Sequence, residues 1–189
     1  MNKQPEKTAQ TKANLSTAFW ELYRDAPMIK ISVKDITDRA GYYRSTFYFH
    51  FKDIYHIVQE KEEEILEEWK KISDERWDQH RNQSAFENLA EFYERNGEYM
   101  SILLSPKGDP AFMQKIKDTM RPKMFARFNL ADNDIKGALA FEFVVSAMVA
   151  FLTEWYRNAE HMSAERAVSL LQELLFGNIE DVISGITVH

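Results

Sequence analysis

The sequence predicts an all-α fold of about nine helices, and three observations support this prediction. Apolar residues recur at intervals of three and four along most of the 189-residue chain, which is the period of a helix. Residues that favour helix ends, such as serine, aspartate, glycine and proline, fall between these periodic segments. The sequence contains no convincing strand pattern and no internal repeat. With 44% hydrophobic and 13% aromatic residues, the chain can bury one substantial core, or a small domain docked on a larger one.

The N-terminal segment predicts a helix that follows a disordered tail. Residues 1–10 are polar, and we expect them to be disordered, as chain termini often are. Over residues 11–25, apolar side chains repeat at i, i+3, i+4 and i+7, and this helix ends before Pro27. The repeating residues are Leu15, Ala18, Phe19 and Leu22. This helix provides the core against which the next two helices can pack.

Residues 32–53, SVKDITDRAGYYRSTFYFHFKD, predict two short helices joined by a tight turn. Ser32 is a good N-cap with an acidic residue three positions later, and apolar residues follow at helical spacing. Gly41 lies where the first helix should stop, because glycine adopts the left-handed conformation without steric cost. Phe47 and Phe51, four residues apart, give the second helix a buried stripe. Two such helices form a helix-turn-helix motif, whose second helix enters the major groove of DNA.

The remainder of the chain predicts six further helices. Their expected ranges are 52–79, 84–95, 98–105, 111–128, 135–157 and 163–185. We expect Asn96 and Gly97 to separate the second of these from the third. Asp109 followed by Pro110 is a strong helix start at the end of the loop PKGDP. The helix over residues 135–157 is the most apolar of the chain.

The composition argues against catalysis and against metal binding. The chain has no cysteine, which excludes disulfides, zinc knuckles and thiol nucleophiles. Its five histidines lack the i, i+4 pairing of a helical zinc site, and no glycine-rich phosphate loop is present. No apolar run approaches the length of a membrane span, and the N-terminus lacks the apolar core of a signal peptide. We therefore expect a cytoplasmic protein that is not an enzyme and has no metal, no cofactor and no membrane association.

The charge is distributed unevenly along the chain. The formal net charge is −6, but residues 1–55 hold nine Lys or Arg against six Asp or Glu, a net charge of +3. The remaining residues hold 15 basic against 24 acidic side chains, a net charge of −9. This asymmetry allows the N-terminal part to approach phosphate while the rest of the chain is repelled, which orients an encounter with nucleic acid.

The segment AGYYRSTFYFHFKD resembles the signature of the TetR family of one-component bacterial regulators, in which Ala-Gly opens the turn and Tyr-x-His-Phe closes the recognition helix. The resemblance is sharpest over roughly the first quarter of the chain. Tyr43 departs from it, since a Ser or Thr usually caps the recognition helix at this position. The segments LLSPKGDPAFMQKIKD and FLTEWYRNAEHMSAERAVSLLQELL are weakly similar to a branch of the family that includes dihydroxyacetone-kinase regulators.

The resemblance implies two groups of DNA-contacting residues. Ser32, Tyr48 and Lys52 match positions that hold phosphates. The positions that face base edges are Tyr42, Tyr43, Arg44 and Ser45. Arg44 can present two parallel donors to guanine O6 and N7, whereas a hydroxyl or ammonium group at the groove edge reaches phosphate without reading sequence. The alternative for Tyr48 is packing against the first helix with its hydroxyl in water.

Large aromatic and methionine side chains in the C-terminal part are candidates for a small-molecule pocket. These residues are Phe92, Tyr93, Tyr99, Met100, Met113, Met124, Phe128, Phe143 and Met148. Adaptable side chains of this kind suit apolar pockets, but they suit an ordinary core equally well. The existence of a cavity for an unknown small-molecule effector is implied by the family resemblance.

The last two helices are candidates for a homodimer interface. Their apolar faces exceed what the core of one chain needs, and two helices from each subunit would form a four-helix interface. The candidate residues are Phe151, Trp155, Leu171, Leu175, Ile179 and Val182. Dimerisation also follows from the helix-turn-helix motif, because two recognition helices about 34 Å apart read successive major grooves. The alternative is complete burial of these faces within one chain.

Together these observations predict a ligand-responsive transcriptional regulator that binds a palindromic double-stranded operator as a dimer and acts as a repressor. We expect residues 1–53 to bind DNA and residues 54–189 to bind the effector and the second subunit. One alternative is a co-regulator of the same shape that acts through a protein partner, with weak or no DNA binding. A third possibility is a helical protein that only sequesters a ligand.

Overall fold

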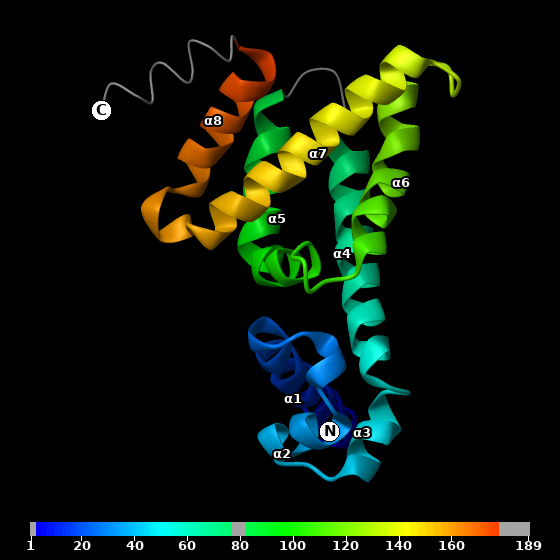
Figure 1. Ribbon diagram of the computed structural model, residues 1–189, viewed down its shortest axis with the longest axis vertical. Helices are drawn as coiled ribbons and strands as arrows, with labels where there is room; N and C mark the ends of the chain where they lie inside the picture. The colour runs from blue at the N-terminus through cyan, green and yellow to red at the C-terminus, as the bar shows by residue number, and fades with distance from the viewer. Residues whose placement is uncertain (1–2, 77–81, 178–189) are drawn as a thin grey trace.

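A computed structural model describes residues 3–76 and 82–177 of the chain. These residues form eight α-helices and two short 3₁₀ helices, with no strand among them, so the predicted all-α class is confirmed. A small unit of three helices lies at one end of the molecule, and a larger helical unit lies at the other (Figure 1). One long helix, α4, starts beside the small unit and runs into the larger one (Figure 1).

The small unit consists of α1 (Lys3–Asp25), α2 (Val33–Ala40) and α3 (Arg44–His50), with a 3₁₀ turn at Met28–Lys30. The predicted capping box is present: Ser32 Oγ accepts a hydrogen bond from the Asp35 amide at 3.3 Å, and Asp35 Oδ2 accepts one from the Ser32 amide at 2.9 Å. Gly41 follows α2 with a φ of 75°, in the left-handed region where glycine is favoured. The local signals of this segment therefore predicted its structure correctly.

The expectation of a disordered tail over residues 1–10 was wrong, because α1 begins at Lys3. The first ten residues contain Glu, Lys, Gln and Ala, which favour helices. Their proline, Pro5, lies in the first turn, where its missing N–H has no partner to lose. The helix that starts here therefore extends by two further turns toward the N-terminus.

The larger unit contains the remaining helices. They are α4 (Ile54–Arg76), α5 (Asn82–Leu103), α6 (Pro110–Arg127), α7 (Ile135–Arg157), the 3₁₀ turn Ala159–His161 and α8 (Ala164–Phe176). The predicted caps at Asp109 and Ser163 are confirmed, since their side chains accept hydrogen bonds from Ala111 N and Arg166 N at 2.8 and 3.4 Å. The last helix was expected to continue to residue 185, but α8 ends at Phe176, because Gly177 has extended backbone angles. Residues beyond 177 lie outside the described part of the chain.

The predicted helix break at Asn96 and Gly97 was wrong, and α5 is continuous through both residues. Asn96 is buried, and its side-chain amide donates hydrogen bonds to Glu68 Oε2 at 2.8 Å and to the Phe92 carbonyl at 3.2 Å. Gly97 lies against the ring of Tyr156, where a Cβ atom would overlap the ring. Both residues serve tertiary packing, so the described residues contain eight α-helices where about nine were expected.

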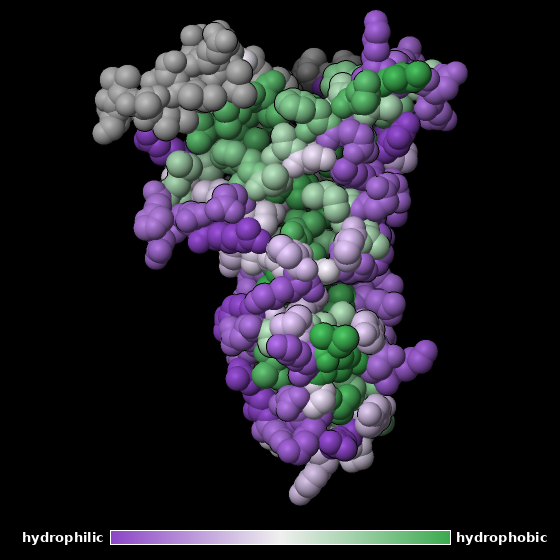
Figure 2. Space-filling view, in the orientation of Figure 1, coloured by the Kyte–Doolittle hydropathy of each residue, from purple (hydrophilic) through white to green (hydrophobic). Residues whose placement is uncertain are grey.

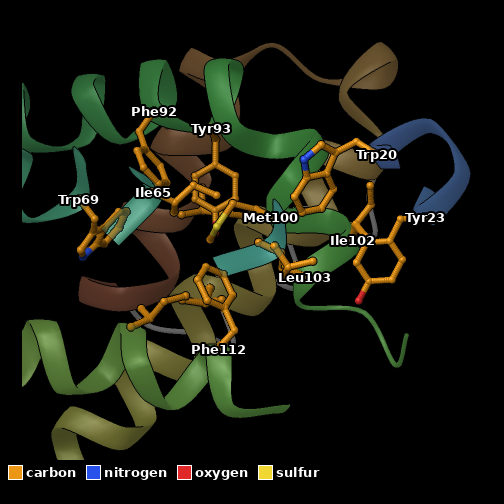
Figure 3. Packing of buried hydrophobic residues seen from close by; sticks show 14 of the residues in the cluster. Trp20, Tyr23, Ile65, Trp69, Phe92, Tyr93, Met100, Ile102, Leu103 and Phe112 are labelled. Carbon is orange, nitrogen blue, oxygen red and sulfur yellow. The ribbon is translucent and has the colours of Figure 1, made fainter. Parts of the chain in front are cut away.

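A single hydrophobic core connects the two units. Trp20 and Tyr23 of α1 lie close to Ile102 and Leu103 at the end of α5, beside the aromatic cluster of the larger unit (Figure 3). The Trp20 ring also packs edge-on against Tyr99, with ring centroids 5.0 Å apart. The small unit is therefore held to the larger one by apolar packing as well as by α4.

Helix α7 is long and apolar enough to cross a membrane by length and composition, with 23 residues and a hydropathy of 1.9. The expectation that no apolar run reaches this length was therefore wrong. In the structure α7 contacts α5, α6 and α8, and Phe141, Val145 and Leu152 are buried on its inner face. Its apolar character thus results in part from its place in the core of the larger unit.

Candidate nucleic-acid interface

The helix-turn-helix positions α3 with its outer face in solvent. Phe47 and Phe51 are buried on the inner face, where α3 packs on α1 and α2. The chain enters α3 through Tyr43, which has extended backbone angles and makes no side-chain cap hydrogen bond. Tyrosine cannot cap the helix as Ser or Thr would. Its exposed ring is available for another contact.

Three of the four predicted base-reading residues lie together at the start of α3. Tyr43 is 83% exposed, and Arg44 and Ser45 are exposed beside it. Within the described residues, the guanidinium of Arg44 makes no ion pair or hydrogen bond. The fourth residue, Tyr42, is half-buried, and its hydroxyl accepts a hydrogen bond from Asn14 Nδ2 of α1 at 2.9 Å. In this conformation Tyr42 joins the turn before α3 to α1 instead of projecting outward.

The three side chains predicted to contact phosphate differ in whether they are free to bind it. Tyr48 and Lys52 are exposed, and the Tyr48 ring packs edge-on against Phe47 with centroids 5.5 Å apart. Both interpretations of Tyr48 therefore remain compatible with its position. Ser32 is exposed as well, but its hydroxyl donates to Asp35 Oδ2 at 2.6 Å, so its hydrogen is already used in the cap.

Two cations without an ion pair among the described residues lie at the two ends of α3. Lys34 and Arg39 of α2 pair with acids of the small unit, with N to O distances of 3.5 and 2.8 Å. Arg44 and Lys52, in contrast, make no ion pair within the described part of the chain. The two ends of α3 therefore carry positive charge that an anionic partner can neutralise.

The predicted DNA contacts leave out one exposed residue of this face, Phe49. Phe49 is 75% exposed on α3, although it is a large apolar side chain. Its only ring contact in the described structure is with His50, which is half-buried, with centroids 5.0 Å apart. Helical spacing alone places Phe49 on the face opposite Phe47 and Phe51, which could have marked it as exposed.

Polar contacts reinforce the junction between the two units. The Tyr23 hydroxyl of α1 donates a hydrogen bond to the carbonyl of Lys107, in the loop between α5 and α6, at 2.9 Å. Lys107 Nζ in turn donates to the carbonyl of Arg24, at the end of α1, at 3.2 Å. Burial, with the Asp109 and Glu62 carboxylates nearby, raises the pKa of the Tyr23 hydroxyl, which stays protonated as a donor. The junction thus links α1 directly to the start of α6.

Ion pairs join α4 to α1 and to α6. Lys12 of α1 pairs with Glu60 at 2.6 Å, and Lys115 of α6 pairs with Glu62 at 2.5 Å. Glu62 is only 2% exposed, and its Oε1 atom has no hydrogen-bond partner. A movement of α6 relative to α4 would separate Lys115 from this buried carboxylate.

A small apolar cavity of about 10 Å³ lies within the larger unit, with room for one water molecule at most. Its lining consists of Ile65, Leu66, Trp69, Phe92, Tyr93, Met100, Ile116 and Val149. Figure 3 shows the rings of Trp69, Phe92 and Tyr93 gathered beside Ile65 and Met100. The sequence interpretation found three of these residues and missed those of α4, α6 and α7.

The other predicted pocket residues lie elsewhere. Tyr99, Met113, Met124 and Met148 are partly buried and pack against the core without lining this cavity. Phe128 and Phe143 are 56% and 70% exposed, so they project away from the interior. Helical spacing placed these two side chains on apolar faces but did not indicate which faces turn inward.

Three buried polar atoms in this region have no hydrogen-bond partner among the described residues: Tyr93 OH, Trp69 Nε1 and Thr153 Oγ1. Tyr93 and Trp69 both line the cavity. Burial raises the pKa of Tyr93, and the nearby Thr153 hydroxyl opposes this rise, although the two hydroxyls do not meet the geometry of a hydrogen bond. Tyr93 therefore remains a neutral hydrogen-bond donor. An acceptor bound in the cavity could receive hydrogen bonds from the Tyr93 hydroxyl and from Trp69 Nε1.

Comparison with known proteins identifies the family. Residues 81–177 match the family model of the TetR group that describes a transcriptional regulator C-terminal region, and this match spans half of the chain. The chain belongs to the TetR family of transcriptional regulators. A comparison with curated proteins finds no match.

Two solved structures share the TetR fold of this chain. A TetR transcriptional regulator from Streptococcus agalactiae 2603V superposes with a TM-score of 0.60 at 21% identity, covering 91% of this chain and 97% of its own. The dihydroxyacetone kinase operon activator DhaS superposes with a TM-score of 0.54 at 18% identity, covering 92% and 97%. At these identities the likeness establishes the fold alone.

The outer face of α7 in this TetR regulator carries a ridge of exposed apolar side chains. Ile135, Leu139 and Phe143 are spaced by four residues and are each about two-thirds exposed or more. Figure 2 shows apolar residues gathered over α7 and α8 on the visible face of the larger unit. An exposed patch of this kind marks an interaction surface more often than a solvated one.

The predicted interface residues lie only partly on this surface. Trp155 and Leu171 are buried in the core of the chain itself, and Trp155 Nε1 donates to the Met162 carbonyl at 2.9 Å. Phe151 and Leu175 are partly buried. Ile179 and Val182 lie outside the described residues. The first half of α7, from which no interface residue was predicted, therefore offers the more exposed apolar surface.

Proposed function

We propose that this TetR-family protein is a cytoplasmic, homodimeric repressor that binds a palindromic DNA operator and is released from it by a small-molecule effector. In this proposal residues 1–53 bind DNA, and residues 54–189 bind the effector and the second subunit. The observation that carries the proposal is the exposed start of α3, where Tyr43 and Ser45 flank an Arg44 that has no partner within the described residues.

The DNA contacts divide into reading and positioning contacts. Arg44 can donate two parallel hydrogen bonds to guanine, and Tyr43 and Ser45 can reach neighbouring base edges. Lys52 and Tyr48, at the other end of α3, reach phosphate oxygens and set the position of the helix. We assign Ser32 a smaller part in phosphate binding, because its hydroxyl hydrogen is donated to Asp35.

Dimerisation through α7 and α8 would place two copies of α3 on one side of the duplex. The exposed ridge of Ile135, Leu139 and Phe143 would be covered by the same ridge of the second subunit or by its α8. A palindromic operator follows from this two-fold symmetry, with half-sites about one helical turn apart.

The effector would bind where the small cavity now lies. The cavity lining is apolar and contains no charged side chain, so we propose a small uncharged ligand with an acceptor for Tyr93 or Trp69. Since the cavity has room for one water molecule at most, such a ligand must displace α4, α5, α6 or α7, which supply its lining.

The displacement would reach the DNA-binding unit by two connections. One is α4, which begins directly after α3, and the other is the Lys107 loop, which contacts the end of α1. In one conformation of the dimer the spacing of the recognition helices matches the half-sites, and in the other it does not. The ligand shifts the population toward the second conformation because it binds that conformation more tightly.

Gel-shift titrations test the DNA assignment directly. A duplex recovered by selecting genomic fragments with the purified protein would be compared with a scrambled duplex of the same length. We expect Arg44→Ala to lose preference for the selected duplex, and Lys52→Ala to weaken binding to both duplexes alike. Equal losses on both duplexes for Arg44→Ala would contradict the base-reading role.

Promoter fusions test the direction of regulation. Repression predicts that deletion of the protein raises expression from a promoter carrying the selected duplex. The structural relative DhaS is an operon activator, so a fall in expression would assign activation to this protein as well.

A further inference from the structure

Phe49 occupies the outermost ridge of the recognition helix. Successive residues of a helix are separated by about 100°, so Phe49 lies about 160° from both Phe47 and Phe51, which are buried. Its ring is 75% exposed for this reason, and Ser45 lies one turn earlier on the same ridge. The side chain that α3 projects farthest from the core is therefore an aromatic hydrocarbon.

The ring of Phe49 does not contribute to the core of the folded chain. Its only ring contact among the described residues is the edge of His50. Exposing so large an apolar surface is unfavourable, and the neighbouring exposed residues Tyr43 and Tyr48 extend the aromatic character of the face. The unpaired cations Arg44 and Lys52 lie before and after Phe49 on the chain. A partner for this face must therefore combine an anionic surface with an apolar group.

The major groove of DNA combines these two features at one base. The base edges there carry hydrogen-bond donors and acceptors, and the C5-methyl group of thymine is the apolar exception. We propose that Phe49 reads thymine in each half-site by packing its ring against this methyl group. The inference rests on the proposed DNA-binding function and adds a specificity contact to it. Since Ser45 and Phe49 are four residues apart, about 6 Å along the helix, the thymine lies about two base-pair steps from the base that Ser45 faces.

Replacing thymine by uracil tests the contact, because uracil pairs identically and lacks only the methyl group. The duplex recovered by selection would be synthesised in both forms and titrated with the wild-type protein. Burial of one methyl group corresponds to about a fourfold change in affinity, so two half-sites predict that the uracil duplex binds about sixteenfold more weakly. Wild-type protein that binds both duplexes equally would overturn the inference.

Variants of Phe49 assign the effect to its ring. Phe49→Ala should bind the thymine and uracil duplexes alike, at about the wild-type affinity for uracil, whereas Phe49→Leu should keep part of the preference. Phe128→Ala is the matched control, since it removes an exposed phenylalanine from the larger unit and should leave the ratio unchanged. A preference for thymine that persists in Phe49→Ala would overturn the assignment.

Failure of this inference is distinguishable from failure of the proposed function. If the protein selects no duplex, and binds neither form in a salt-dependent way, the DNA-binding function itself is contradicted. If it binds the selected duplex in a salt-dependent way but without a thymine preference, only the role of Phe49 is overturned. Thermal unfolding of Phe49→Ala should match the wild type, because the ring is not part of the core.

Discussion

The buried ion pair between α4 and α6 gives a stability prediction that follows from the geometry. Lys115→Met removes the cation that lies 2.5 Å from the Glu62 carboxylate, whose side chain is 3% exposed. Breaking a buried pair by removing one partner costs about 3–5 kcal/mol. Lys115 itself is 43% exposed, so water screens part of the interaction and the lower end, about 3 kcal/mol, is expected. For a chain of this size the melting temperature should fall by about 6–12 °C.

Thermal unfolding followed by circular dichroism measures this loss, and Lys117→Met is the matched control. Lys117 lies on the same helix and pairs with Glu142 at 2.6 Å, but the Glu142 side chain is 48% exposed. Replacing Lys117 should cost about 1 kcal/mol or less, as for other pairs with a solvated partner. The double variant Glu62→Leu with Lys115→Met should recover most of the lost stability, since no unpaired charge remains buried. Equal melting temperatures for Lys115→Met and Lys117→Met would refute this reasoning.

Three further predictions address packing, assembly and ionisation. Gly97→Ala should lower the free energy of unfolding by about 1 kcal/mol, because overlap with Tyr156 outweighs the gain in helix propensity, and a raised melting temperature would contradict it. Leu139→Glu should convert a dimer into a monomer by light scattering at micromolar concentration, and an unchanged mass would place the interface elsewhere. Because burial raises the pKa of Tyr93 in the folded state, stability should fall as the pH rises above about 10, and Tyr93→Phe should reduce this fall in alkaline melts. A Tyr93→Phe variant with the same alkaline loss as wild type would assign that loss to other groups.

Much of the fold was predictable because its signals are local. Ser32, Asp109 and Ser163 begin helices by accepting hydrogen bonds from amides two or three residues later, and Gly41 ends α2 by its left-handed backbone. These effects depend on residues adjacent in sequence. The all-α class and the helix-turn-helix followed from them directly.

The errors arose where distant residues decide the structure. Asn96 and Gly97 are weak helix formers in isolation, but Glu68 and Tyr156 give them places inside a continuous helix. Likewise, spacing alone identified Phe143 as part of an apolar face without indicating that this face is exposed. Tertiary partners are not encoded in the local pattern, so such residues could not be assigned from sequence.

The candidate DNA-binding face was predicted only in part, because some of its residues depend on tertiary partners. The exposure of Tyr43, Arg44 and Ser45 followed from their place at the start of the second helix. The inward position of Tyr42 depends on Asn14, 28 residues earlier, and no local signal indicates that contact. The spacing of Phe49 from Phe47 and Phe51 placed it on the opposite face of the helix, but spacing does not indicate which exposed residues bind DNA.

The salt dependence of DNA binding tests the central claim most directly. The dissociation constant for the selected duplex would be measured by fluorescence anisotropy between about 50 and 200 mM salt. A dimer that neutralises several phosphates predicts that the logarithm of the dissociation constant rises linearly with the logarithm of the salt concentration, with a slope of about 0.9 for each phosphate. Lys52→Ala should reduce this slope by about 2, one contact per subunit. A dissociation constant that does not change with salt would contradict DNA binding through α3 and would favour a partner protein as the target of this face.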